Sequence, residues 1–144
     1  FVTKGGVARL DGDSWYTYTS FNSSLLNESI RKIKCGYNGH VWLLYLSEQD
    51  IACFDGATWT NYSREMLGIG ENYINDIAVD DSGVLWMACE DGLYRFDGVS
   101  GQKFSGGTMP AISEIRDIYV DTRNHVWLVP NGYNSIYRYS GVIW

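Results

Sequence analysis

Residues 74–98 of the chain read INDIAVDDSGVLWMACEDGLYRFDG, and this stretch decides the fold. It holds an apolar run from Ile74 to Val79, a second run around Trp86 and a third from Gly92 to Phe96. Asp, Ser and Gly separate the runs, and Asp-Gly follows the last one. Short apolar or aromatic runs bounded by such residues predict β-strands joined by tight hairpins.

The same pattern returns along the chain with a period of forty-odd residues. The Val-Trp-Leu type triplets centred on Trp42, Trp86 and Trp127 are 44 and 41 residues apart. The glycines of the Asp-Gly or Ser-Gly turns, at positions 12, 56, 98 and 141, are 44, 42 and 43 residues apart. Two independent anchors with one period indicate a structural repeat.

Each copy predicts four short strands, a to d, and four antiparallel strands recurring at this period are typical of a β-propeller blade. Strand a is expected at Ile30–Cys35, Ile74–Val79 and Ile115–Val120, and strand b carries the tryptophan. Strand d is expected to begin at Trp15, Trp59 and Trp144, and in the third copy at Phe104 after a short insertion. No stretch shows a helical apolar period over three turns.

The sequence therefore predicts an all-β protein, with residues 1–144 forming one β-propeller unit. It holds three four-stranded antiparallel repeats and a partial one: a partial blade at 1–19, blades at 27–62 and 73–104, and a blade at 115–144 that lacks most of its last strand. Three blades leave exposed edges and apolar faces. We expect the ring to be completed by oligomerisation, with a homodimer as the first choice, or by blades that a longer chain supplies.

The charge and composition of the chain disfavour two classes of partner, nucleic acids and membranes. The net charge is −6, and no cluster of Lys and Arg appears, which disfavours nucleic acid and an anionic membrane surface as partners. No apolar run reaches the length of a transmembrane span, so no membrane insertion is predicted.

The cysteines and acidic residues predict no metal or cofactor. The chain has an odd number of cysteines, namely Cys35, Cys53 and Cys89, and none of them forms a C-x-x-C pair. Because they lie in apolar stretches, they are interpreted as small buried side chains. Glu71, Asp76 and Glu114 lack the spacing of a calcium loop.

No catalytic motif is recognised. Asp80-Asp81 and Glu90-Asp91 are adjacent carboxylates, but their places in the repeat are turns, where solvated charge is expected. His40 and His125 hold equivalent positions two residues before a tryptophan, which favours a structural role. Asp81-x-Gly83-x-x-Trp86 partly resembles the Asp-box turn of sialidases, a folding device, and no G-x-S-x-G elbow occurs. The chain is predicted not to be an enzyme.

Residues 74–86 and 92–97 resemble the two-component-regulator propeller repeat, which reads roughly I-x-x-I-x-x-D-x-x-G-x-L-W and then G-L-x-R-F-D. The other copies match more loosely: Asn124 replaces a turn glycine and Ser140 replaces the aspartate. The resemblance implies an extracytoplasmic module of bacterial sensors, periplasmic or secreted. Its motif residues shape the fold and specify no ligand.

The expected function is non-catalytic binding of a ligand or partner, like the sensor input domain of that family. In propellers the strand-a starts and the loops beside them crowd around the channel mouth, and loops on a rigid scaffold commonly carry function. A polar ligand such as a sugar or carboxylate is expected there. The alternative is a self-assembling lectin-like or structural protein with equivalent sites in each blade. The candidate ligand-binding residues are Arg31, Tyr45, Asn75, Asp76, Glu90, Arg116, Asp117 and Tyr133.

Overall fold

A computed structural model describes residues 1–36, 38–46, 50–106, 112–132 and 134–141 of the chain. Within those ranges the secondary structure is all β, and no helix is long and apolar enough to cross a membrane. The chain divides into two compact units, which are described separately. Unit 1 holds Phe1–Cys35 and Gly39–Ser63, and unit 2 holds Gly36–Asn38 and Arg64–Trp144.

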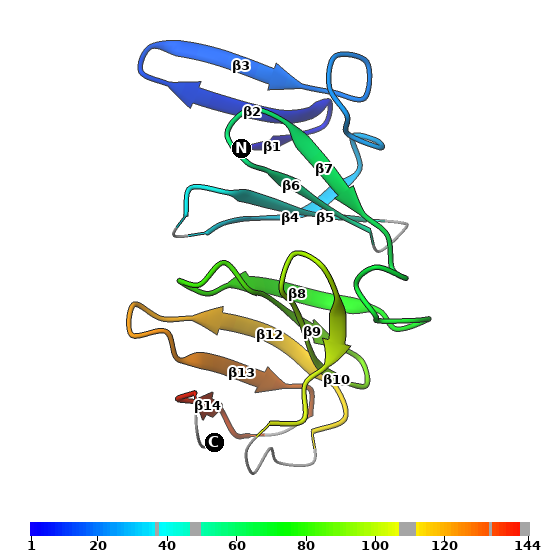
Figure 1. Cartoon of the computed structure of the whole chain (residues 1–144), viewed down its shortest axis with the longest axis vertical. Helices are drawn as coiled ribbons and strands as arrows, with labels where there is room; N and C mark the ends of the chain where they lie inside the picture. Colours follow the sequence, from blue (N-terminus) through cyan, green and yellow to red (C-terminus); the bar gives the residue numbers. More distant parts are fainter. Residues whose placement is uncertain (37, 47–49, 107–111, 133, 142–144) are drawn as a thin grey trace. The chain divides into compact units, whose positions relative to one another are not determined.

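Unit 1 contains two antiparallel sheets (Figure 1). The first has the order β1-β2-β3 and corresponds to the partial blade. The second is a complete blade with the order β4-β5-β6-β7. The strands are β1 (Val2–Thr3), β2 (Gly6–Asp11), β3 (Ser14–Tyr18), β4 (Ile30–Cys35), β5 (Val41–Tyr45), β6 (Ile51–Phe54) and β7 (Trp59–Tyr62).

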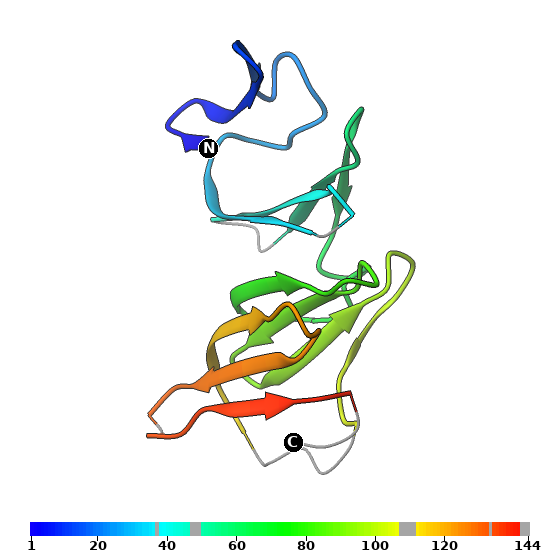
Figure 2. The ribbon, with the colours of Figure 1, turned by 90° about the vertical axis from the view of Figure 1, so that its left-hand side faces the viewer.

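Unit 2 contains the third and fourth blades, whose first strands, β8 and β12, lie side by side (Figures 1 and 2). The third blade has the order β11-β10-β9-β8 and the fourth β12-β13-β14. The strands are β8 (Ile74–Val79), β9 (Leu85–Cys89), β10 (Gly92–Phe96), β11 (Gly101–Lys103), β12 (Ile115–Val120), β13 (Val126–Pro130) and β14 (Tyr137–Tyr139).

The predicted propeller blades are confirmed, including the bounds of all three a strands. The strands form because each apolar run ends at a turn that only certain residues accept. At the turn between strands a and b, Gly83 has φ 84° and Asn124 has φ 63°, a left-handed conformation that favours Gly and Asn. Asn124 therefore replaces the turn glycine without losing the hairpin.

The prediction for strand d of the third blade is wrong. Between strands c and d, Leu10 pairs with Trp15 in the first blade and Phe54 pairs with Trp59 in the second. The corresponding pair of the third blade is Phe96 with Gly101. Gly101 therefore holds the tryptophan position, without an insertion, and Phe104 lies three residues further along. A Cβ at Gly101 would overlap the backbone of Leu67, so the close passage of residues 64–73 leaves room only for glycine.

The cores lie between the sheets of each unit. All five residues of β9 are buried, and Trp86 is 6% exposed. Trp42 is also buried, whereas Trp127, at the equivalent position of the fourth blade, is only partly buried. The predicted strand d at Trp144 and the candidate residue Tyr133 lie outside the described residues.

Candidate functional site

The start of every strand a carries a β-bulge. The pairing register shifts between Ile30 and Lys32, between Ile74 and Asp76, and between Ile115 and Asp117. A bulge inserts one extra residue and can re-aim a side chain, and bulges are over-represented at sheet edges and next to active sites. The bulged residues are Arg31, Asn75 and Arg116, which the sequence placed in matching register.

In unit 2, the third-blade bulge fastens the fourth blade. The side-chain amide of Asn75 donates to the Ile115 carbonyl at 2.9 Å. Oδ2 of Asp76 accepts the amide of Ile118 at 3.3 Å, and Asp76 is buried. These two predicted ligand-binding residues thus connect β8 to β12, because the carboxylate and amide satisfy backbone groups on the neighbouring strand a.

The equivalent residues of the fourth blade are open to solvent. Nε of Arg116 donates to Oδ2 of Asp117 at 2.8 Å, with 63% and 48% of the two side chains exposed. An exposed ion pair contributes little to stability, so it can exchange its partners for a ligand at small cost. Glu90 is also exposed, at the end of strand b, where its amide donates to the Tyr73 carbonyl at 3.2 Å.

Of the candidates in unit 1, Arg31 is partly buried and Tyr45 is fully buried. The Tyr45 hydroxyl accepts the amide of Leu26 at 3.0 Å and donates to Oδ1 of Asn61 at 3.1 Å. In this structure Tyr45 therefore connects β5 to the loop before β4 and to β7. Its aromatic ring completes the apolar face of β5 because its strand position faces the core.

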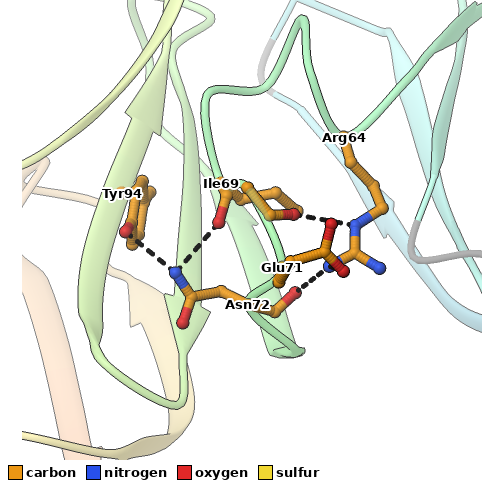
Figure 3. A network of polar contacts seen from close by, with 6 residues as sticks. Arg64, Ile69, Glu71, Asn72 and Tyr94 are labelled. Carbon is orange, nitrogen blue, oxygen red and sulfur yellow. Dashed lines mark hydrogen bonds and ion pairs between the residues drawn. The ribbon is translucent and has the colours of Figure 1, made fainter.

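A second polar cluster, which sequence reasoning missed, surrounds the loop from Arg64 to Tyr73 (Figure 3). Nε and Nη2 of Arg64 donate to the carbonyls of Gly70 and Asn72, at 2.9 and 3.1 Å. Nδ2 of Asn72 donates to the Ile69 carbonyl at 2.9 Å and to the Tyr94 hydroxyl at 3.0 Å. The loop is thus tied to itself and to β10.

The cluster continues to Asp91, whose Oδ2 accepts hydrogen bonds from Tyr94 at 3.1 Å and Lys103 at 2.8 Å. Burial opposes ionisation of Asp91, but these bonds outweigh it and hold the pKa of the carboxyl below its usual value. Burial and the bond to Asp91 raise the pKa of Tyr94 to about 12. Asp91 is therefore an anchored carboxylate that is exposed in a turn, as the sequence predicted.

Asp80 departs from the solvated charge that the sequence predicted for it. It is 7% exposed, its Oδ1 accepts the amides of Ser82 and Val84, and its Oδ2 accepts the indole N–H of Trp86 at 2.9 Å. The repeat-equivalent Asp121 binds the amides of Arg123 and His125 and the indole N–H of Trp127 in the same way. The signal was present in the sequence as an aspartate six residues before each of these tryptophans.

The two histidines lie beside structural groups. Nδ1 of His125 is 3.1 Å from Oδ2 of Asp121, and Nδ1 of His40 is 3.7 Å from the Cys53 sulfur.

Burial raises the pKa of the Cys53 thiol to about 11 and that of the Cys89 thiol to about 12, so neither is an activated nucleophile. Cys35 is exposed, against the prediction that all three are buried. The described ranges hold no group of three His, Cys, Asp or Glu suited to a metal ion.

Unit 1 contains a cavity of about 220 Å³ between its two sheets, and nothing in the sequence had indicated it. Its walls are mainly apolar and aromatic, and Arg9 is the charged residue among them. The lining residues are Phe1, Val7, Ala8, Arg9, Leu10, Tyr18, Ile33, Cys35, Val41, Phe54 and Trp59.

Comparison with known proteins supports the resemblance seen in the sequence. Residues 68–91, which run from the Arg64–Tyr73 loop through Trp86, match the family model described as two component regulator propeller. Comparison with curated proteins gives no match.

Solved structures share the fold at low sequence identity. The extracellular domain of a hybrid two-component system from B. thetaiotaomicron aligns with a TM-score of 0.61 and 24% identity, over 88% of this chain and 18% of that one. Virginiamycin B lyase from Staphylococcus aureus aligns with a TM-score of 0.65 and 20% identity, over 96% and 46%. PorZ from Porphyromonas gingivalis aligns with a TM-score of 0.60 and 15% identity, over 90% and 21%. The chain thus spans less than half the length of each of these structures.

Proposed function

We propose that this chain, with its two-component-regulator propeller repeat, is part of a non-catalytic sensor module that binds a small polar ligand at the strand-a starts. The observation that carries the proposal is the repeated bulge, which places Arg31, Asn75 and Arg116 at one repeat position. Arg116 and Asp117 offer a cation and an anion side by side with exposed side chains. A sugar or a small carboxylate has the hydrogen-bonding groups that match them.

The same proposal gives the module an extracytoplasmic place, periplasmic or secreted. It is supported by the family match at residues 68–91 and by the extracellular domain of a hybrid two-component system among the structures that share the fold. Cell fractionation with an antibody against the chain tests it, and recovery in the cytoplasmic fraction contradicts it.

Isothermal titration with monosaccharides, uronic acids and small dicarboxylates tests the ligand. We expect one of these classes to bind, and Arg116→Ala to weaken the binding at least about tenfold, since a charged hydrogen bond contributes about 1.5–3 kcal/mol. Arg123→Ala is the matched control, because Arg123 is exposed in the turn between β12 and β13. Equal loss in both variants, or no binding in the panel, contradicts the proposal.

The second candidate is a lectin-like protein, which the repetition of the bulge in three blades favours. The titration separates the two by stoichiometry: a sensor binds one ligand per closed propeller, and a lectin binds one per blade. Enzymatic activity is a third reading, because the fold is shared with a lyase. A hydrolase and lyase panel in which turnover disappears with a single substitution would establish it instead.

A further inference from the structure

The sequence contains two Asn-Gly pairs, Asn38-Gly39 and Asn131-Gly132, and both lie in turns that follow or precede a strand. The glycines have a left-handed backbone, with φ 80° at Gly39 and φ 73° at Gly132. Glycine accepts this conformation because it has no Cβ. The missing Cβ also leaves the amide nitrogen of each glycine open to approach by the side chain of the asparagine before it.

An asparagine that precedes glycine is able to modify itself in water. The glycine nitrogen attacks the asparagine Cγ, and the new C–N bond closes a succinimide ring. The Cγ–Nδ2 bond breaks, and Nδ2 takes up the proton of the glycine amide and leaves as ammonia. Water then adds to one of the ring carbonyls and opens the ring to aspartate or to isoaspartate, in which the backbone runs through the side chain. The sequence of steps needs no oxidant or reductant.

The Asn131 side chain meets the requirements of this reaction. Asn131 and Gly132 are both exposed, so water reaches the reacting atoms. Among the described residues, the side-chain amide of Asn131 has no hydrogen-bond partner, and the residue is held through its backbone alone. The amide is therefore free to rotate onto the nitrogen of Gly132.

The Asn38 side chain is restrained, although it is exposed as well. Its Oδ1 lies 2.7 Å from the position that a Cβ on Gly36 would take, and its Nδ2 lies 3.2 Å from the corresponding position on Gly83. The amide thus packs closely against the backbone of two turns. Rotation onto the nitrogen of Gly39 would break these contacts, which favours the unreacted state at this site.

The position of Asn131 gives the modification a local consequence. Its backbone N–H donates to the Glu114 carbonyl at 3.0 Å, so Asn131 lies beside the start of β12. Arg116, with its exposed side chain, follows two residues after Glu114. Either product adds a carboxylate next to this strand start, and isoaspartate also lengthens the backbone between β13 and β14 by one methylene group.

We propose that Asn131 is a self-modification site, at which the folded chain converts a neutral amide into a carboxylate beside the strand-a start of the fourth blade. The same reaction at Asn38 is slowed by the packing of its side chain. The proposal goes beyond the binding function proposed above, and it is tested without a ligand.

Peptide mapping by mass spectrometry of the folded 144-residue chain, incubated in heavy-oxygen water, tests the proposal. We expect the peptide with Asn131 to take up heavy oxygen and to split into aspartate and isoaspartate forms at least about fivefold faster than the peptide with Asn38. This ratio corresponds to one contact that must break before Asn38 reacts. Equal rates at the two sites, or a faster reaction at Asn38, overturn the proposal.

The chain unfolded in urea is the matched control. Both sites then carry the same Asn-Gly pair without the contacts of the fold, so their rates should agree within about twofold. A fivefold difference that persists in urea would show that neighbouring sequence sets the rates, and the structural assignment would be wrong.

Two substitutions test the two sites separately. Asn131→Gln keeps an amide but requires a larger ring, so it should abolish isoaspartate at this position and leave the rate at Asn38 unchanged. Gly36→Ala places a methyl group against the Asn38 amide, displaces it and should speed the reaction at Asn38 toward its rate in urea. If circular dichroism shows Gly36→Ala to be folded and the rate at Asn38 is unchanged, packing does not protect that site and the proposal fails.

Discussion

The turn that leads into strand b is built differently in the second blade and in the two blades of unit 2. Asp80 and Asp121 each accept two turn amides and one indole N–H. Gly36 holds the corresponding position of the second blade and has no side chain to accept a bond. The indole N–H of Trp42 is buried and has no acceptor among the described residues. The strand-b tryptophan is therefore buried both in blades where its indole N–H has an acceptor and in the second blade, where it has none among the described residues.

This difference separates two contributions to the stability of a blade. Burial of the strand-b indole is a non-directional apolar contribution that all blades can share. The turn carboxylate adds a directional contribution from hydrogen bonds, because one side chain fixes both the turn and the rotamer of the ring. The second blade shows that the fold forms without the directional term, at the cost of a buried, unsatisfied N–H.

Removal of either buried tryptophan ring tests the apolar contribution that the blades share. Trp86→Ala and Trp42→Ala should each lower the free energy of unfolding by about 3–5 kcal/mol, because each leaves a large cavity in a close-packed core. Urea unfolding followed by circular dichroism measures the loss. If the two losses differ by more than about 2 kcal/mol, burial is not the term that the blades share.

Removal of the carboxylate tests the directional term. Asp80→Ala should cost about 2–3 kcal/mol, because it leaves the buried indole N–H of Trp86 and two turn amides without their acceptor. Asp81→Ala is the neighbouring control and should change the free energy of unfolding by less than about 0.5 kcal/mol, since Asp81 is exposed. Equal effects at the two positions would show that the buried carboxylate does not order the turn.

Replacement of the ring by phenylalanine sharpens the comparison. Trp86→Phe should lower the free energy of unfolding by about 1–3 kcal/mol, because phenylalanine has no N–H to donate to the buried carboxylate of Asp80. Trp42→Phe should cost less than about 1 kcal/mol, since the lost apolar area is offset by the removal of an unsatisfied N–H. Thermal unfolding of both variants measures the difference, and the reverse order would break the comparison.

The smallest effect is a pH dependence at Asp121. Hydrogen bonds from the Trp127 indole and the His125 amide hold the pKa of this carboxyl well below its usual value. A folded-state pKa below the unfolded one stabilises the protein above the unfolded value, about 4, and this contribution is lost as the pH falls toward the folded-state pKa. The stability difference between the parent and Asp121→Asn should therefore shrink between about pH 5 and pH 3. A difference that is constant over this range would contradict the assignment.

Local signals in the sequence determined the blades. The bounds of β4, β8 and β12 followed from apolar runs ended by turn residues, because hairpin geometry depends on neighbours in the chain. The candidate residues Arg31, Asn75 and Arg116 were correctly recognised as equivalent, since a repeat position is itself a sequence property. The aspartate six residues before Trp86 and Trp127 was equally visible and identifies the anchored turn.

Only the tertiary structure decided which polar groups are used inside the fold. Asn75 and Asp76 serve β12, some forty residues away, and the Tyr45 hydroxyl is bound by Leu26 and Asn61. The glycine at position 101 and the cavity beside Tyr18 depend on which strands pass each other. These features arise from contacts between residues distant in the chain, and a repeat pattern read along one chain does not record which of its positions meet across a joint between blades.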